Sequence, residues 1–136
     1  MTSRMPQAHD ICGTVYRRGT ALLLARVVAE DGHPITPGEI ASAEYSIFEV
    51  DPEDPESRRP IAGHTARGVA VGGLITDSLR TDFPWDVDQT GYNFRHVLDV
   101  SEDPAFPAAG RHYLVEFSLR PVEGQIILVR FRLYAI

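Results

Sequence analysis

Short stretches in which apolar and polar residues alternate recur along the chain, and turn residues separate them. Alternation with a period of two is typical of β-strands that bury one face. No segment repeats apolar residues at the helical spacing over several turns. About seven strand-like stretches occur in this way, which predicts an all-β fold and favours an antiparallel β-sandwich over a barrel.

The clearest alternation lies near the C-terminus. Apolar residues occupy every second position in residues 113–119 and again in residues 127–135, and residues 121–124 supply a turn between the two runs. Two such runs joined by a short turn predict a closing C-terminal hairpin. Its other face carries Arg130 and Arg132, which we expect to meet water or a protein partner.

Further strands are predicted upstream of this hairpin. Residues 43–50 carry apolar groups on both faces, which indicates a central, covered strand. Residues 91–100 also alternate, and residues 68–79 indicate a weak strand, a bend and a second short extended piece. Residues 51–60 contain three prolines, which cannot donate to a β-ladder, so this stretch predicts an exposed loop.

The N-terminal part predicts a strand pair. Residues 11–16 and 20–28 are rich in apolar and β-branched residues, and a turn-like break separates them. The Asp-Gly signal at residues 31–32 closes the second strand. Thr36 followed by Pro37 predicts a single helical turn.

Length and charge bound the class of protein. The chain has 136 residues, which suits one domain, and we expect that domain to span residues 11–136 behind a flexible N-terminal arm, residues 1–10. The net charge is −6, and all 13 basic residues are arginine. This balance argues against a nucleic-acid partner, because affinity for nucleic acid depends on cations placed at phosphates. The absence of lysine excludes Schiff-base chemistry and a Walker-type phosphate loop.

No targeting or membrane segment is expected. Residues 1–10 lack the apolar region of a signal peptide, and no apolar run approaches the ~18 residues of a membrane span. The lone Cys12 cannot form an internal disulfide, and we interpret it as a small buried apolar residue. These features predict cytoplasmic synthesis, no signal peptide and no membrane partner.

Motifs for catalysis are missing from the sequence. It contains no nucleophile elbow, zinc-protease, Cys-x-x-Cys or glycine-rich phosphate motif. No two histidines stand three or four residues apart, and His96 and His112 are the pair that distant strands could bring together on one sheet. We interpret both as partly exposed strand residues. The sequence therefore predicts no catalytic residue, no cofactor and no enzyme.

The densest polar and aromatic cluster lies in a predicted loop, residues 82–90, and at the start of the next strand. Asp86, Asp88, Thr90 and Gly91 match the first half of a calcium-binding loop, but Val97 stands where the twelfth position requires an acid. We therefore expect a structured corner, in which the aspartates bond backbone N–H groups and Gly91 supplies backbone freedom. Asp86 and Asp88 stay as the candidate metal ligands.

Aromatic residues mark the expected core and its borders. Trp85 is expected to close one end of the core or to anchor an interface. Tyr92 is expected to act as a corner tyrosine, whose hydroxyl bonds back to the backbone. Phe94, Tyr113 and Phe117 are expected in the core or at an interface.

Several short motifs together carry a resemblance to a known family. They are GTALLL at 19–24, DGHPIT at 31–36 before the strand containing Tyr45-Ser46-Ile47, the stretch from Trp85-Asp86 to Gly91-Tyr92-Asn93-Phe94, and GRHY at 110–113. With them the chain resembles the immunoglobulin-like β-sandwich domains of tailed-phage virion proteins. These are the N-terminal domain of baseplate upper proteins and related small tail or head-accessory proteins.

The resemblance implies an immunoglobulin-like sandwich and a non-catalytic structural subunit, present in many copies in the tail or baseplate or on the head. Its partners would be other virion proteins and copies of itself, and its location the virion. Docking is expected through loops 51–60 and 81–92, edge strands and the N-terminal arm. One alternative is a bacterial immunoglobulin-like binding module that recognises protein or carbohydrate through its loops, and another is an enzyme or metal protein.

Arginine marks surfaces at which docking is expected. Arg17 and Arg18 lie in a predicted turn, while Arg130 and Arg132 lie on the outer face of the last strand. Because the guanidinium group bonds carboxylates and stacks on aromatic rings, arginine suits protein interfaces. The predicted interface or structural residues are Arg17, Arg18, Trp85, Asp86, Asp88, Gly91, Tyr92, Arg130 and Arg132.

Overall fold

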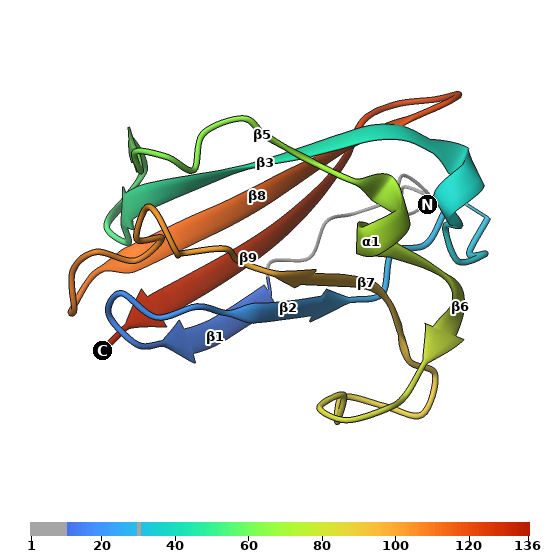
Figure 1. Ribbon diagram of the computed structural model, residues 1–136, viewed down its shortest axis with the longest axis horizontal. Helices are drawn as coiled ribbons and strands as arrows, with labels where there is room; N and C mark the ends of the chain where they lie inside the picture. The colour runs from blue at the N-terminus through green and yellow to red at the C-terminus, as the bar shows by residue number, and fades with distance from the viewer. Residues whose placement is uncertain (1–10, 30) are drawn as a thin grey trace.

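Two β-sheets face each other in the computed structural model, which describes residues 11–29 and 31–136 (Figure 1). The larger sheet has the strand order β1-β9-β8-β3-β4, with β5 also paired to β3, and the smaller sheet has the order β2-β7-β6. The strands of the larger sheet are β1 (Ile11–Val15), β3 (Ile40–Asp51), β4 (Asp54–Pro60), β5 (Arg67–Val69), β8 (His112–Pro121) and β9 (Ile127–Ala135). Those of the smaller sheet are β2 (Leu22–Ala25), β6 (Ile75–Arg80) and β7 (Tyr92–Val97). The predicted all-β sandwich is confirmed, and the predicted arm, residues 1–10, lies outside the described residues.

The predicted C-terminal hairpin forms the centre of the larger sheet. β8 and β9 pair in register from His112 opposite Tyr134 to Leu119 opposite Ile127, and β3 pairs antiparallel with the other side of β8. The inward positions of β8 are completely buried, as the alternation predicted. They are Tyr113, Val115, Phe117 and Leu119.

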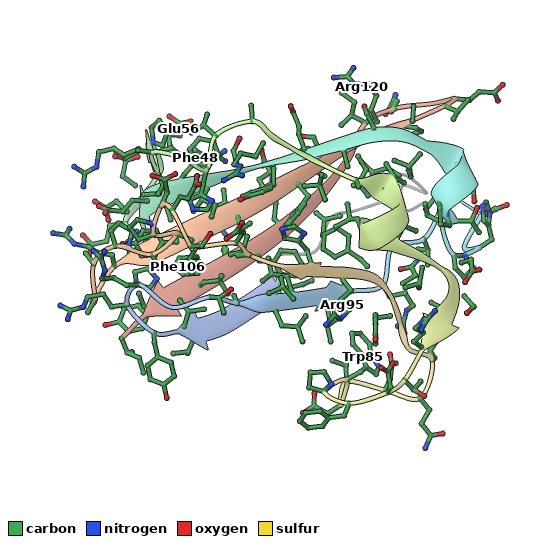
Figure 2. The ribbon with its side chains drawn as sticks, in the orientation of Figure 1. Phe48, Glu56, Trp85, Arg95, Phe106 and Arg120 are labelled. Carbon is green, nitrogen blue, oxygen red and sulfur yellow. The ribbon has the colours of Figure 1, made fainter. Side chains whose placement is uncertain are left out.

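Aromatic rings fill the space between the sheets. Phe94 of β7 packs edge to face on Phe117 of β8, with the ring centroids 4.8 Å apart, and Phe131 of β9 lies 5.7 Å from Phe94. Phe106, from the connection between β7 and β8, is completely buried and packs 5.3 Å from Tyr113 (Figure 2). Because these rings come from both sheets, their packing joins the two layers. The prediction that Phe94, Tyr113 and Phe117 belong to the core is confirmed.

The two N-terminal strands form, but they do not pair with each other. β1 runs parallel to β9, and β2 runs antiparallel to β7, so the predicted strand pair is wrong. The turn between them crosses from the larger sheet to the smaller one. Distant segments hold this turn, because Arg17 N–H donates to the Ile136 carbonyl and Arg18 N–H donates to the Phe106 carbonyl.

The proline-rich stretch after β3 is a strand, so the prediction of an exposed loop over residues 51–60 is wrong. β4 pairs antiparallel with β3, with Pro60 opposite Phe48 and Arg58 opposite Val50. β4 is the outermost strand on its side of the larger sheet. An outer strand tolerates proline because one row of its N–H groups needs no partner.

Two short helical turns connect strands. The bend predicted within residues 68–79 is α1 (Val71–Leu74), which lies between β5 and β6 and buries Leu74 completely. The predicted turn after Thr36 is the 3₁₀ turn η1 (Pro37–Glu39), which leads into β3. The Thr36 N–H and hydroxyl both donate to the Glu39 carboxylate, at 3.1 and 2.9 Å, which fixes the start of this turn.

Candidate functional site

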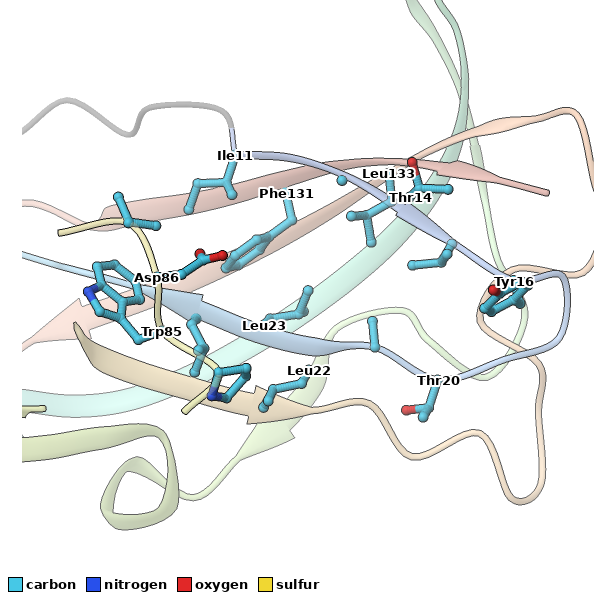
Figure 3. A pocket seen from close by; sticks show the side chains of 16 residues that line it. Ile11, Thr14, Tyr16, Thr20, Leu22, Leu23, Trp85, Asp86, Phe131 and Leu133 are labelled. Carbon is cyan, nitrogen blue, oxygen red and sulfur yellow. The ribbon is translucent and has the colours of Figure 1, made fainter. Parts of the chain in front are cut away.

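A groove of about 480 Å³ opens where the edges of the two sheets meet (Figure 3). One wall is β1, the outermost strand of the larger sheet, and the other is β2, the outermost strand of the smaller sheet. Phe131, Leu133 and Leu23 line the groove from the core side. The loop between β6 and β7 adds Trp85 and Asp86. An open strand therefore borders the groove on each side.

The backbone of β2 has a free hydrogen-bonding edge toward the outside of the smaller sheet. The Ala21 carbonyl accepts a hydrogen bond from the Leu98 N–H, so Ala21 and Leu98 form a hydrogen-bonded pair. Such pairs alternate with non-bonded pairs in an antiparallel ladder, which directs the N–H and C=O groups of Leu22 and Leu24 away from β7. Among the described residues, none forms a backbone hydrogen bond with these outward groups.

The same alternation applies to β1 across the groove. The Val15 carbonyl accepts a hydrogen bond from the Ile136 N–H, which places the polar backbone groups of Val15 toward β9. The backbone groups of the preceding residue, Thr14, therefore point away from β9. Both outer strands thus present backbone donors and acceptors next to the same groove.

Large apolar side chains are exposed around the groove. Tyr16, Leu22 and Val87 line it and stay 74, 37 and 71% exposed. Val97 lies directly opposite Leu22 on β7, and Phe83, two residues before Trp85, is 94% exposed. We call the groove together with these five side chains the groove face. Gathered apolar surface of this kind marks sites at which a protein contacts a partner.

Asp88 organises the loop that carries Trp85. Its carboxylate accepts the backbone N–H groups of Thr90 and Gly91, both at 3.0 Å, and the Trp85 indole N–H at 3.2 Å. Arg26, just after β2, donates to the other carboxylate oxygen at 2.8 Å. The predicted structured corner is therefore present, and it holds Trp85 in place beside the groove.

The electrostatics of this corner follow from the same contacts. The Gly91 backbone N–H and then the Arg26 guanidinium lower the pKa of Asp88 from its ordinary value to about 2. Gly91 itself has a positive φ of 103°, and a Cβ atom there would lie 2.4 Å from the Arg80 carbonyl oxygen. The predicted need for glycine at this position has two physical causes, conformation and close approach.

Tyr92 is not the corner tyrosine, which corrects the prediction. Its hydroxyl donates to the Asp82 carboxylate at 2.8 Å, and its ring packs against Trp85 with the centroids 5.6 Å apart. The corner bond belongs instead to Tyr113 at the start of β8. The Tyr113 hydroxyl donates to the Ala108 carbonyl and accepts the Ala108 N–H, at 3.1 and 3.0 Å.

Asp86 differs from the other aspartates of the loop. It has the only charged side chain among the described residues that line the groove. Asp82 and Asp88 are hydrogen bonded to Tyr92 and Arg26, whereas no described residue forms an ion pair or a side-chain hydrogen bond with Asp86. The groove therefore carries one carboxylate that a partner can neutralise.

The predicted arginines do not gather at one site. Arg17 and Arg18 have exposed side chains and follow Tyr16 at one end of the groove. Arg130 and Arg132 lie on the outer face of the larger sheet, opposite the core side of β9. There Arg130 donates to Glu116, directly across on β8, at 2.7 Å. The structure thus brings Trp85, Asp86, Asp88, Gly91 and Tyr92 together. Arg130 and Arg132 lie elsewhere, on the outer face of the larger sheet.

Histidines and acids do not converge on a metal site within the described part of the chain. No three His, Cys, Asp or Glu side chains there are placed to hold one ion, and the Asp88 carboxylate is occupied by local donors. His96 packs on Tyr45 and Phe117, while His112 packs on Tyr134, so the two rings have separate neighbours. Both are partly exposed strand residues, as interpreted from the sequence.

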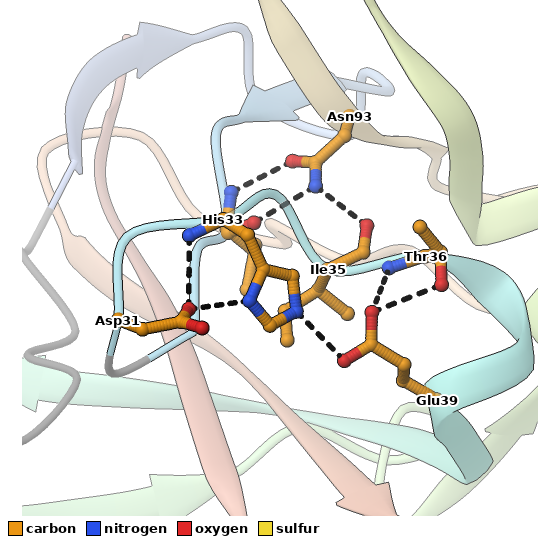
Figure 4. Close-up of polar contacts among 7 residues, drawn as sticks. Asp31, His33, Ile35, Thr36, Glu39 and Asn93 are labelled. Carbon is orange, nitrogen blue, oxygen red and sulfur yellow. Dashed lines mark hydrogen bonds and ion pairs between the residues drawn. The ribbon is translucent and has the colours of Figure 1, made fainter.

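Sequence reasoning missed Asn93, which fixes the segment that follows β2 (Figure 4). Asn93 is completely buried. Its amide N–H₂ donates to the carbonyls of Val27 and Ile35, and its carbonyl accepts the Val27 N–H at 2.7 Å. The available signal was an asparagine, a poor strand former, placed between two aromatic residues in a predicted strand.

A second polar contact holds the same segment. The imidazole of His33 bonds Asp31 through Nδ1 and Glu39 through Nε2, the latter at 3.0 Å (Figure 4). Hydrogen bonding to Glu39 and then to Asp31 raises the pKa of His33. This clamp ties the turn after β2 to the start of β3.

Comparison with known proteins supplies no further identification. The chain matches no protein-family model, no curated protein and no solved structure. Within the described residues, no helix has the length and apolar character needed to cross a membrane.

Proposed function

We propose that this protein is a non-catalytic structural subunit that assembles with other proteins through the groove face. One observation carries this proposal: two open sheet edges and a group of exposed apolar side chains coincide in one place. Open edges promote pairing with another chain, and natural sheets usually block them with charge, proline or a covering segment. The strands that form its walls, β1 and β2, contain no proline and no charged residue, and Asp86, in the loop beside them, is the only charged residue among the described lining residues.

The strand order supports an immunoglobulin-like form of the sandwich. The smaller sheet, β2-β7-β6, corresponds to strands B, E and D of that topology, and β9-β8-β3-β4 corresponds to G, F, C and C′. Tyr113 adds a second feature, because a tyrosine near the start of strand F that bonds back to the backbone is typical of these domains. Immunoglobulin-like sandwiches commonly serve as interaction modules, which agrees with an assembly role.

The setting we propose is the virion of a tailed phage or a phage-like particle, with other virion proteins and further copies of this chain as the partners. The sequence resemblance supports this setting, and the groove face supports the assembly role. A subunit of this kind needs contact surfaces and no reaction centre.

Recognition through loops is the second candidate function. The 94% exposed ring of Phe83, in the loop between β6 and β7, favours it. The Trp85 indole N–H, which sugar hydroxyls would otherwise accept, is already bonded to Asp88. This geometry favours a protein over a carbohydrate as the loop's partner.

The assembly role is tested by site-specific cross-linking of the full chain. A photo-reactive phenylalanine analogue replaces Val87 on the groove face or, as the matched control, Val122 on the turn between β8 and β9. The two valines are similarly exposed, at 71 and 66%. We expect a discrete cross-linked product of fixed mass from position 87 in assembled material, and little product from position 122.

Identification of the cross-linked protein by mass spectrometry decides the outcome. A second copy of the chain or one defined structural protein supports the proposal. The proposal is contradicted if the chain stays monomeric by light scattering and gives no cross-linked product at either position. Equal amounts of product at the two positions also contradict it.

A further inference from the structure

We propose that the groove binds an extended segment of a different protein, which adds to β2 as a fourth strand of the smaller sheet and places a cationic side chain against Asp86. This inference rests on the proposed assembly function and specifies the partner for the groove face. It is argued from the backbone edge, the side chains beside it and the charge of the groove.

The unpaired backbone groups of β2 match the hydrogen-bonding pattern of an added strand. Leu22 and Leu24 direct their N–H and C=O groups away from β7, so the donors and acceptors recur at every second residue. Only a partner in extended conformation presents matching groups at that spacing. With four residues in β2, a partner segment of about five residues would span the edge at ~3.3 Å per residue.

The side chains around this edge set the pattern of the partner. Alternate side chains of an added strand would point toward the core side of the groove, where Phe131, Leu133 and Leu23 lie. Apolar residues such as valine or leucine fit those positions because the lining is apolar. The intervening side chains would lie beside Leu22, whose side chain is 37% exposed.

Asp86 sets the charge of the partner. It is the only charged lining residue among those described, and it has no ion-pair partner in the described chain. An arginine in the partner satisfies this carboxylate with a charge-assisted bond. The Trp85 ring, next to Asp86 in the groove lining, offers the guanidinium a face on which to stack.

A second copy of the chain fits this pattern poorly. The outer strand with the most arginines, β4, contains Pro60 and two acidic residues beside its two arginines. Arg59 is bonded to Glu49, and Arg58 lies over the Phe48 ring at 5.5 Å. These arginines would have to leave their own partners to reach Asp86, so a different protein is the better occupant.

The test measures binding of capped, fluorescein-labelled seven-residue peptides to the full chain by fluorescence anisotropy. In all of them valine alternates with threonine, and one threonine position carries arginine, glutamine or glutamate. We expect the arginine peptide to bind about tenfold more tightly than the glutamine peptide, as one satisfied charge pair implies, and the glutamate peptide to bind most weakly. Asp86→Asn should remove the preference for arginine.

Two modified arginine peptides test strand addition itself. Each carries N-methyl groups on alternate amides, one set on the odd residues and the other on the even residues. A strand paired along one edge uses only one set of amides, so one peptide should lose binding and the other should keep it. Leu22→Glu should abolish binding, and Val122→Glu, which lies outside the groove, should leave it unchanged.

Several outcomes overturn the proposal. They are equal binding by the two methylated peptides, an unchanged arginine preference in Asp86→Asn, or binding that survives Leu22→Glu in a chain with the wild-type melting temperature. If no peptide binds while position 87 still cross-links to a second copy, the strand-addition inference is wrong and the assembly function stands. If neither peptides nor cross-links appear, both are wrong.

Discussion

β4 is an edge strand of the larger sheet, and β2 is an edge strand of the smaller sheet. The two differ greatly in how well they are protected against pairing with another chain. β4 has the sequence DPESRRP, with charge or proline at nearly every position. β2 has the sequence LLLA, with neither. The arginines of β4 are also held by neighbours, since Arg58 lies over Phe48 and Arg59 pairs with Glu49.

This difference predicts that the edge of β4 stays unpaired, whereas the edge of β2 can pair with another chain. Charge and proline on an outer strand discourage pairing with a second chain, because a newly added strand would bury the charges and find donors missing. β2 has no such protection, and it borders a groove lined by apolar side chains. An open apolar edge of this kind tends to pair with other chains, and the proposed assembly role uses that property.

The largest effect is predicted for the buried amide that holds the segment after β2. Asn93→Leu removes the bonds to Val27 and Ile35 and leaves the Val27 N–H and the Ile35 carbonyl buried without those partners. Two buried unpaired backbone groups should lower the free energy of unfolding by about 3 kcal/mol. Urea unfolding followed by circular dichroism measures the loss.

Arg59→Ala is the matched control on the protected side. The Arg59 side chain is 74% exposed, and Arg111 lies 3.9 Å from the same Glu49 carboxylate, so loss of the Arg59–Glu49 pair should lower the free energy of unfolding by less than about 1 kcal/mol. Equal losses in the two variants would mean that the β2 side does not depend on its buried amide.

The second prediction exchanges the character of the two edges. Replacing both Arg58 and Arg59 with valine removes the cations from β4, and we expect self-association to strengthen by about tenfold, or 1.4 kcal/mol. Leu24→Lys charges the β2 edge and should weaken peptide binding to the groove by a similar factor. Sedimentation velocity measures the first effect and fluorescence anisotropy the second.

The exchange also has a clear negative result. If the double valine variant stays as monomeric as the wild type, the charges of β4 do not protect its edge. The contrast between the two strands would then carry no information about assembly.

The third prediction concerns the Asp88 carboxylate, which fixes the position of Trp85 beside the groove. Asp88→Ala removes the acceptor shared by Trp85, Thr90 and Gly91. We expect the single tryptophan to become more exposed, with a red shift of its fluorescence and weaker binding of the arginine peptide, while the melting temperature changes little. An unshifted spectrum would show that Tyr92 packing and the bond from the indole N–H to the Asp88 backbone carbonyl are enough to position the indole.

The parts of this fold that the sequence predicts well are those set by local patterns. Alternation in β8 and β9 predicts a hairpin because both strands and their turn are contiguous. The parallel pairing of β1 with β9 joins the two ends of the chain and has no local signature. The edge position of β4 was missed for a related reason, since a proline signals a loop unless the strand is known to be outermost.

The candidate site shows the same division. The loop from Trp85 to Tyr92 was found because its acids, glycine and aromatics are adjacent in sequence. The sequence does not separate Tyr92 from Tyr113 as the corner tyrosine, because each lies at the start of a strand, and only the fold brings Ala108 to the Tyr113 hydroxyl. The groove itself could not be predicted, because its walls come from strands of different sheets.

The smallest predicted effect is a pH dependence confined to the β2 side. Bonds to Glu39 and then to Asp31 raise the pKa of His33 above its ordinary value of 6.5, whereas β4 contains no histidine. A raised pKa in the folded state means that protonated His33 stabilises the fold. Its contribution is complete below pH 6.5 and is lost as the pH rises through the raised value.

Hydrogen exchange measured by NMR at about pH 6 and about pH 9 should therefore show lower protection factors at the higher pH for residues 27–29 and 31–36. Protection factors should stay unchanged for β4 and for the end of β3 that pairs with it, residues 48–51. His33→Gln replaces the imidazole with a neutral amide that does not titrate in this range, and it should abolish the difference between the two pH values. Equal changes on both sides would mean that the clamp does not titrate separately from the rest of the molecule. Because the His33 side chain is solvent-exposed, its ion pairs stabilise the fold only weakly, and we expect the change in protection factors to be small and confined to this segment.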